Sequence, residues 1–155
     1  MNKFINRISA TILVILRMLF GLFWLLAGIN KVNDDWMTSP ILENIFLQRL
    51  TELPPDTFAV FYLTKFAIPF YQPIGWFITL GELYSAIGLL IGLTTRSSAV
   101  LSFFILFNFA IGGYYDASLI PFFILVLLFI KYPTGQWFGM DALLTRFFPN
   151  NKLFH

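Results

Sequence analysis

The sequence contains no cysteine, and this absence excludes several kinds of chemistry at once. Without thiols the chain has no disulfide, no cysteine-held iron–sulfur cluster and no thiolate zinc site. Histidine is almost as scarce, because the only one, His155, is the last residue, and a haem held by histidines is therefore not expected. We expect no metal and no covalently bound cofactor. Any redox role then depends on a partner's cofactor or on a diffusible molecule such as a quinone.

Charged residues are also scarce in this sequence. Only 12% of residues are charged, against about a quarter in soluble domains, whereas 58% are hydrophobic and 19% are aromatic. The mean hydropathy is +0.77. Such a chain cannot supply the polar shell of a soluble fold, which indicates an integral membrane protein in contact with the lipid bilayer. The sequence pI near 9.0 is explained by membrane topology, and we expect no nucleic-acid binding.

Four long apolar stretches predict helices that cross the membrane, because backbone groups in lipid must pair within their own segment. The expected helices cover about residues 8–29, 74–93, 99–114 and 119–132. Short connections, TTRSS and YYDAS, make the last three antiparallel neighbours. We therefore expect an all-α integral membrane four-helix bundle that forms a single domain over residues 1–155.

The basic residues predict the orientation of this bundle. One side of the membrane is expected to carry Lys3, Arg7, Arg96, Lys131, Arg146 and Lys152, with Asp141 as the only acid, where it caps a short helix. The other side carries six acidic residues and three basic ones. The positive-inside rule then places both termini in the cytoplasm of a multi-pass protein.

The segment between the first two expected helices, about residues 31–73, is the one sizeable extramembrane part. Leu42, Phe46 and Leu50 recur at helical spacing, and an aromatic stretch with a single lysine follows Pro54 and Pro55. We interpret this extracytoplasmic insert as amphipathic helices that lie at the outer interface as a lid. A gate for a substrate or partner is the alternative.

Two ionisable residues fall inside the apolar stretches. A central arginine costs about 2.5–3.5 kcal/mol to place in a membrane, so Arg17 is expected to face the bundle interior. Glu82 is followed by uncharged residues as far as Arg96. We predict that Arg17 and Glu82 form an ion pair at the centre of a polar pocket in the outer half of the bundle, joined by Asn108, Asn30 and Lys31. The alternative is that the pair only fixes the register of two helices.

Small residues line the expected packing faces of the first two helices, where they permit close helix approach. These residues are Gly21, Gly28, Gly81, Ser85, Gly88 and Gly92. The sequence alone leaves open whether these faces join helices of one chain or of two, so a homo-oligomer remains an alternative.

Three ordered motifs resemble those of the DoxX family of membrane proteins. ILRMLFGLFWLLAGINKV is similar to the family's first helix, GELYSAIGLLIGLTTRSSAV resembles its second signature, and YPTGQWFGMDALL is similar to its glycine-rich, aspartate-bearing end. The long insert resembles that of the DoxD-like thiosulfate:quinone oxidoreductase small subunits.

The resemblance implies a four-helix protein of the bacterial cytoplasmic (inner) membrane. It also implies, as the leading expectation, the membrane subunit of a quinone-linked oxidoreductase that acts on a small sulfur compound or serves a soluble redox partner. The chain itself is then at most a subunit of an enzyme. The alternatives are a permease or exporter of small molecules or lipids, and a non-catalytic membrane assembly or recruitment protein.

Overall fold

The computed structural model describes residues 2–148, and side chains from residue 8 to residue 148. Lys3, Arg7, Lys152 and His155, named above, lie outside the residues whose side chains are described. Every regular element in the described range is a helix, which confirms the all-α prediction. The elements are α1 (Asn2–Asn33), α2 (Ile41–Glu52), α3 (Phe58–Tyr62), the π-helix η1 (Leu63–Ala67), α4 (Tyr71–Ile91), α5 (Thr95–Ile111), α6 (Leu119–Lys131), α7 (Thr134–Trp137) and α8 (Met140–Phe147).

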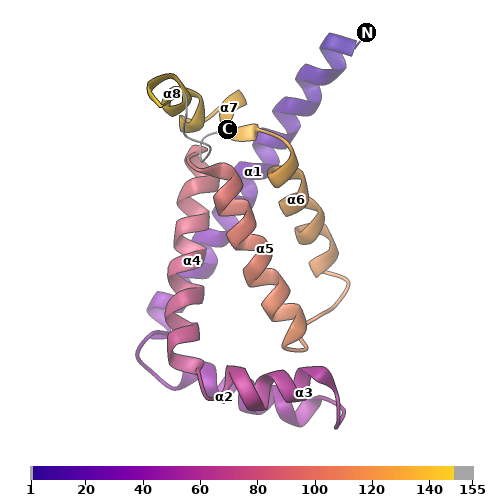
Figure 1. Cartoon of the computed structure of the whole chain (residues 1–155), viewed down its shortest axis with the longest axis vertical. Helices are drawn as coiled ribbons and strands as arrows, with labels where there is room; N and C mark the ends of the chain where they lie inside the picture. Colours follow the sequence, from indigo (N-terminus) through magenta and orange to yellow (C-terminus); the bar gives the residue numbers. More distant parts are fainter. Residues whose placement is uncertain (1, 149–155) are drawn as a thin grey trace.

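The helices α1, α4, α5 and α6 run side by side along the long axis of the molecule (Figure 1). Each contacts the next, since α1 packs on α4, α4 on α5, α5 on α6, and α6 returns to α1. Large apolar side chains from all four helices fill the space between them, among them Trp24, Leu89, Ile105 and Phe129. Because lipid tails are as apolar as these side chains, close packing between the helices, rather than removal from water, holds them together.

Two of these helices are long and apolar enough to cross a membrane. They are α1, over Ile8–Asn33, and α4, over Tyr71–Ile91, whereas α5 and α6 are apolar but shorter. Many large apolar side chains of these helices point outward, including Leu19, Leu80 and Ile124. Such a surface suits lipid and is rare on a soluble protein. That all four helices cross the bilayer stays a prediction.

The insert forms its own layer at one end. Figure 1 shows α2 and α3 lying across the ends of the long helices, with α7 and α8 at the opposite end. Leu42 and Phe46 of α2 are buried against Leu63 and Ala67 of η1, and Ile74 of α4 packs on this cluster. The spacing of apolar residues in α2 therefore serves burial against the bundle. That this end faces away from the cytoplasm stays a prediction.

The helix bounds differ from the expected ones where other parts of the chain intervene. α1 continues to Asn33, beyond the expected residue 29, so that Lys31 lies in its last turn. α5 begins at Thr95 rather than near residue 99, because the carboxylate of Asp141 accepts hydrogen bonds from the N–H groups of Thr94 and Thr95.

Small residues set the close approach of α4 to both of its neighbours. A Cβ on Gly21 would lie 2.8 Å from the backbone nitrogen of Leu90, and one on Gly28 would lie 2.8 Å from the side chain of Leu83. Gly81, Ser85 and Gly88 lie instead where α4 meets α5: Gly81 near Ile105, Gly88 near Ser98, and the Ser85 hydroxyl 3.3 Å from the Ser98 carbonyl. These close approaches join helices within one chain.

Gly92 has a different role from the predicted one. It does not lie in the packing face of α4 but ends the helix, with a φ of +69° that side chains rarely adopt. A Cβ there would lie 2.7 Å from the Cα of Gly139 and 2.9 Å from Nη1 of Arg17. The residue therefore lets three segments of the chain meet at one point.

Candidate functional site

Glu82 is paired with Lys31, and the predicted ion pair between Arg17 and Glu82 is wrong. The Nζ of Lys31 lies 2.9 Å from Oε1 of Glu82, whose side chain is 1% exposed. The ammonium group also lies 4.7 Å from the ring centroid of Trp36, which follows the end of α1. The sequence predicts Lys31 as a member of the pocket beside the Arg17–Glu82 pair, whereas the extension of α1 makes Lys31 the direct partner of the acid.

Arg17 lies toward the other end of the bundle. Its guanidinium donates hydrogen bonds of 2.7 Å to the carbonyl oxygens of Thr134 and Phe138, in the segment that contains α7. The reason is the axial register of α1 against α4, in which Gly28 meets Leu83 and Gly21 meets Leu90. This register brings Arg17 level with Gly92, the end of α4, and leaves Glu82 about three turns away along that helix.

Asp141 completes this C-terminal cap. Its two carboxylate oxygens accept hydrogen bonds of 2.7 Å and 3.0 Å from the backbone N–H groups of Thr94 and Thr95. Its own N–H donates to the carbonyl of Gly92 at 2.8 Å. The sequence predicted that Asp141 caps the short helix that follows it, but the carboxylate caps α5 instead, where it meets the positive end of the helix dipole. Asp141 also supplies an opposite charge that attracts Arg17.

Asn30 lies outside any polar pocket. It is exposed on α1, and its carbonyl accepts a hydrogen bond of 2.9 Å from the N–H of Asp34 in the turn that follows. The predicted pocket is therefore divided among three places: Lys31 with Glu82 in the middle of α4, Arg17 in the C-terminal cap, and Asn108 on α5. Helical periodicity predicted which residues face inward, but not which of them meet.

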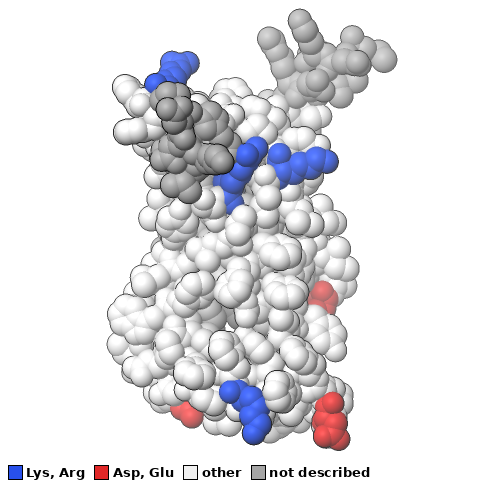
Figure 2. Space-filling view, in the orientation of Figure 1, with Lys and Arg blue, Asp and Glu red and all other residues white. Residues whose placement is uncertain are grey.

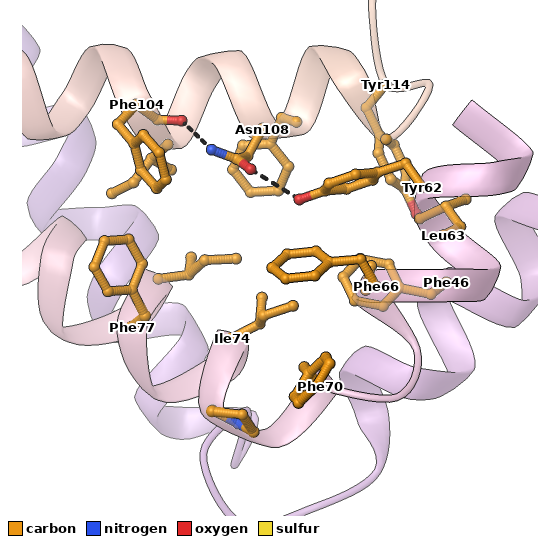
Figure 3. Close-up of a pocket in the computed structure, with 16 residues that line it drawn as sticks. Phe46, Tyr62, Leu63, Phe66, Phe70, Ile74, Phe77, Phe104, Asn108 and Tyr114 are labelled. Carbon is orange, nitrogen blue, oxygen red and sulfur yellow. Dashed lines mark hydrogen bonds between the residues drawn. The ribbon is translucent and has the colours of Figure 1, made fainter. Parts of the chain in front are cut away.

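Asn108 lines a pocket of about 490 Å³ between the insert and the bundle. Figure 3 shows residues from α2, α3, η1, α4 and α5 around this space. The hydroxyl of Tyr62 donates to Oδ1 of Asn108 at 2.8 Å, and Nδ2 of Asn108 donates to the carbonyl of Phe104 at 2.8 Å. Most of the wall is apolar and aromatic; its members include Phe46, Leu63, Phe66, Phe70, Ile74, Phe77, Ile78, Phe104, Ile105 and Phe109.

Among the residues that the structure describes, those that line this pocket are all uncharged. Burial raises the pKa of the Tyr62 hydroxyl above its ordinary value, so the phenol stays neutral and can donate at physiological pH. Asn108 keeps one amide hydrogen beyond the one it donates to Phe104. The pocket is thus suited to an uncharged, largely apolar molecule with one hydrogen-bond acceptor, within the usual size range for small-molecule sites.

Most of this pocket is not evident from the sequence, because its wall comes from the insert. Tyr62, Phe66 and Phe70 recur every fourth residue, and neighbouring rings lie 5.4 Å and 5.7 Å apart. That spacing was visible in the sequence, but it is equally typical of an interfacial lid. Only the placement of η1 against α4 and α5 turns this stripe into a wall.

Comparison with known proteins places the chain in a family. Residues 12–112 match the DoxX family model; the match runs from within α1 to the end of α5 and includes Arg17, Lys31, Glu82 and Asn108. Comparison with curated proteins and with solved structures gave no match. With well over half of its residues matched, and with helices long and apolar enough to cross a membrane, the chain belongs to the DoxX family of membrane proteins.

Proposed function

We propose that this DoxX-family chain is the membrane subunit of a quinone-linked oxidoreductase and that the pocket beneath the insert binds the quinone. One observation carries the proposal: a pocket of about 490 Å³ whose lining residues are uncharged and whose largely apolar wall holds a hydrogen-bonded phenol–amide pair, Tyr62 and Asn108. A lipid-soluble quinone has the matching chemistry, since its ring and tail are apolar and its carbonyl oxygens accept hydrogen bonds.

The proposed binding mode follows from the donors that remain. The second amide hydrogen of Asn108 donates to one quinone carbonyl, while Phe66, Phe77 and Phe104 contact the ring and the first part of the tail. Reduction of a quinone takes two electrons and two protons. The electrons come from a partner that carries its own cofactor, because a chain without cysteine offers no thiol-based carrier.

The same proposal places α1, α4, α5 and α6 across the bacterial cytoplasmic membrane with the termini on the cytoplasmic side. The exposed basic residues of the C-terminal half support this orientation. Figure 2 shows basic side chains toward the end that carries α7 and α8, whereas the acidic side chains visible in this view lie, together with basic side-chain atoms, in the half that carries α2 and α3. Membranes retain basic loops on the cytoplasmic side. The quinone pocket then lies toward the outer face.

The test is quinone binding by the purified, reconstituted chain. The wild-type protein is expected to retain quinone through mild purification and to bind a short-chain quinone saturably. Asn108→Leu removes the donor and is expected to weaken binding about tenfold, the effect of one hydrogen bond of about 1.4 kcal/mol. Phe104→Trp is expected to weaken binding further by filling the pocket.

A matched control removes a tyrosine hydroxyl elsewhere. Tyr84 hydrogen-bonds to Thr94 at 2.8 Å on the exposed surface, so Tyr84→Phe should leave binding unchanged while Tyr62→Phe reduces it. Absence of quinone in the purified protein, together with no saturable binding of the short-chain quinone, would sink the proposal. Solute flux through reconstituted vesicles that requires Glu82 would then favour a permease built on the Lys31–Glu82 pair.

A further inference from the structure

The helix α8 has its polar and apolar faces reversed relative to a helix on a soluble protein. Asp141 is buried, with an exposed fraction of 4%, and the Thr145 hydroxyl on the same face donates to the Asp141 carbonyl at 2.7 Å. Met140, Leu143 and Phe147, at helical spacing on the opposite face, have exposed fractions of 41%, 53% and 76%. An amphipathic helix on a soluble protein turns its apolar face to the core.

This reversed orientation is fixed by contacts from three long helices. Asp141 is held by the first N–H groups of α5 and by the Gly92 carbonyl after α4. Arg17 of α1 holds the carbonyls of Thr134 and Phe138, just before α8. Rotation of α8 to bury its apolar face would break the Asp141 contacts. These tertiary hydrogen bonds therefore keep the apolar face of α8 turned outward.

Exposed cations lie at the same end of the molecule as this face. Arg96 at the start of α5, Lys131 at the end of α6 and Arg146 on α8 are all exposed. The acid within the same segments, residues 92–98 and 131–148, is Asp141, which is buried and bound to N–H groups. Exposed Trp137 and Phe138 extend the apolar surface. Figure 2 shows basic side chains gathered toward this end of the molecule.

We propose that this cap surface, made of Trp137, Phe138, Met140, Leu143 and Phe147 with the cations Arg96, Lys131 and Arg146, is a binding surface for anionic phospholipid headgroups. The apolar residues enter the boundary between headgroups and acyl chains, and the cations bind the phosphates. Trp and Tyr are enriched at this depth of a membrane. Two such rings lie beside the surface: the ring centroids of Tyr132 and Trp137 are 6.2 Å apart, and Lys131 lies over the Tyr132 ring. The inference does not depend on what the pocket beneath the insert binds.

Charge complementarity favours lipid over a second copy of the chain. A second copy that used the same surface would bring two sets of these cations together, which is unfavourable. The exposed acids of the chain lie at the opposite end, on the insert and its turns, where they cannot meet this surface within one membrane. An anionic leaflet supplies both an apolar layer and a negative charge at the required level.

The experiment uses the full chain in vesicles with brominated lipids, which quench nearby tryptophans. The difference between wild type and Trp137→Phe isolates the Trp137 signal. We expect brominated phosphatidylglycerol, at a minor fraction in phosphatidylcholine, to quench Trp137 more than the same fraction of brominated phosphatidylcholine. Replacing Arg96, Lys131 and Arg146 by glutamine should abolish this preference for phosphatidylglycerol. Each single replacement should lower the preference about fivefold. Lys65→Gln, at the other end, is the matched control.

Each outcome decides the proposal. Preferential quenching that falls with the three substitutions, and on raising the salt from about 0.1 to 1 M, supports it. Equal quenching by both lipids overturns headgroup recognition and leaves only apolar contact. No quenching of Trp137 by either lipid overturns the membrane location. In that case a cross-link from Leu143→Cys to a second copy or to a soluble protein identifies what covers the surface.

Discussion

Lys31 and Glu82 form an ion pair around a buried carboxylate, with 2.9 Å between Nζ and Oε1. A second pair, Arg49 and Glu52, is shorter at 2.6 Å, yet both of its side chains are partly exposed, with 48% for Glu52 against 1% for Glu82. The N···O distance alone therefore does not show which of the two pairs contributes more to stability. Desolvation makes an unpaired charge far more costly at the buried site than at the surface.

The same substitution at the two acids tests this ranking. Glu82→Gln removes the counter-ion of Lys31, whose side chain is only 13% exposed, and we expect it to lower the free energy of unfolding by about 2 kcal/mol. Glu52→Gln removes a surface pair and should cost less than about 1 kcal/mol. Equilibrium unfolding in mixed micelles measures both, and equal losses at the two sites would contradict the argument.

Arg17 is expected to hold the C-terminal cap in place. Arg17→Met deprives the carbonyls of Thr134 and Phe138 of their donors, and two charge-assisted hydrogen bonds are worth about 3 kcal/mol together. Arg146 is already exposed on α8, but trypsin needs an unfolded backbone around it; release of α7 and α8 should let α8 unfold, so the rate of cleavage after Arg146 is the measurement. Arg17→Lys keeps the charge but lacks the planar fork that reaches two carbonyls, and it should give an intermediate rate. Wild-type cleavage of Arg17→Met would refute the assigned role.

These contacts show how far the sequence could predict the polar residues. Insertion costs predicted correctly that Arg17 and Glu82 are turned inward, where both are about 1% exposed. Periodicity defines a face of a helix but not its axial position against a neighbour, and a slide of one turn, about 5.4 Å, exchanges every partner. The close approach of Gly21 and Gly28 to α4 sets that position, and it pairs Lys31, not Arg17, with Glu82.

The contacts of the C-terminal segment and of the insert could not be predicted from the sequence for a different reason. Arg17 binds Thr134 and Phe138, which are 117 and 121 residues further along the chain. Asp141 binds the N–H of Thr94, which is 47 residues before it. No local pattern reports such long-range contacts. The pocket is similar, since Tyr62 meets Asn108 across 46 residues. The sequence supplied the helices and their apolar faces, and tertiary packing supplied the site.

Gly92 and Gly112 provide a matched pair of glycines at helix ends. Gly92→Ala places a side chain at a φ of +69° and puts its Cβ 2.7 Å from the backbone of Gly139. Backbone cannot move aside as a side chain can, so we expect Gly92→Ala to lower the free energy of unfolding by more than about 2 kcal/mol. Gly112 has a φ of −68°, and its nearest atom would be at an ordinary 3.4 Å. Gly112→Ala should change stability by no more than about 0.5 kcal/mol. Thermal unfolding followed by circular dichroism measures both, and a tolerated Gly92→Ala would show that the cap can shift.

The titration of Tyr62 gives a pH dependence with a definite sign. Burial raises the pKa of its hydroxyl in the folded state, so the folded protein binds this proton more tightly than the unfolded chain does. The stabilisation is fully present below the ordinary tyrosine pKa of about 10 and is lost as the pH rises through the raised folded-state value. The stability difference between wild type and Tyr62→Phe should therefore be constant from about pH 6 to 9 and should shift against the wild type above about pH 10. A difference that stays constant beyond pH 10, or an absorbance titration of Tyr62 at the ordinary pKa, would mean that the hydroxyl is not held neutral in the pocket wall. If Tyr62 ionises only at its raised pKa, as expected, a ligand that accepts hydrogen bonds from this wall should lose affinity over the same alkaline range, because ionised Tyr62 would compete as an acceptor for the amide of Asn108.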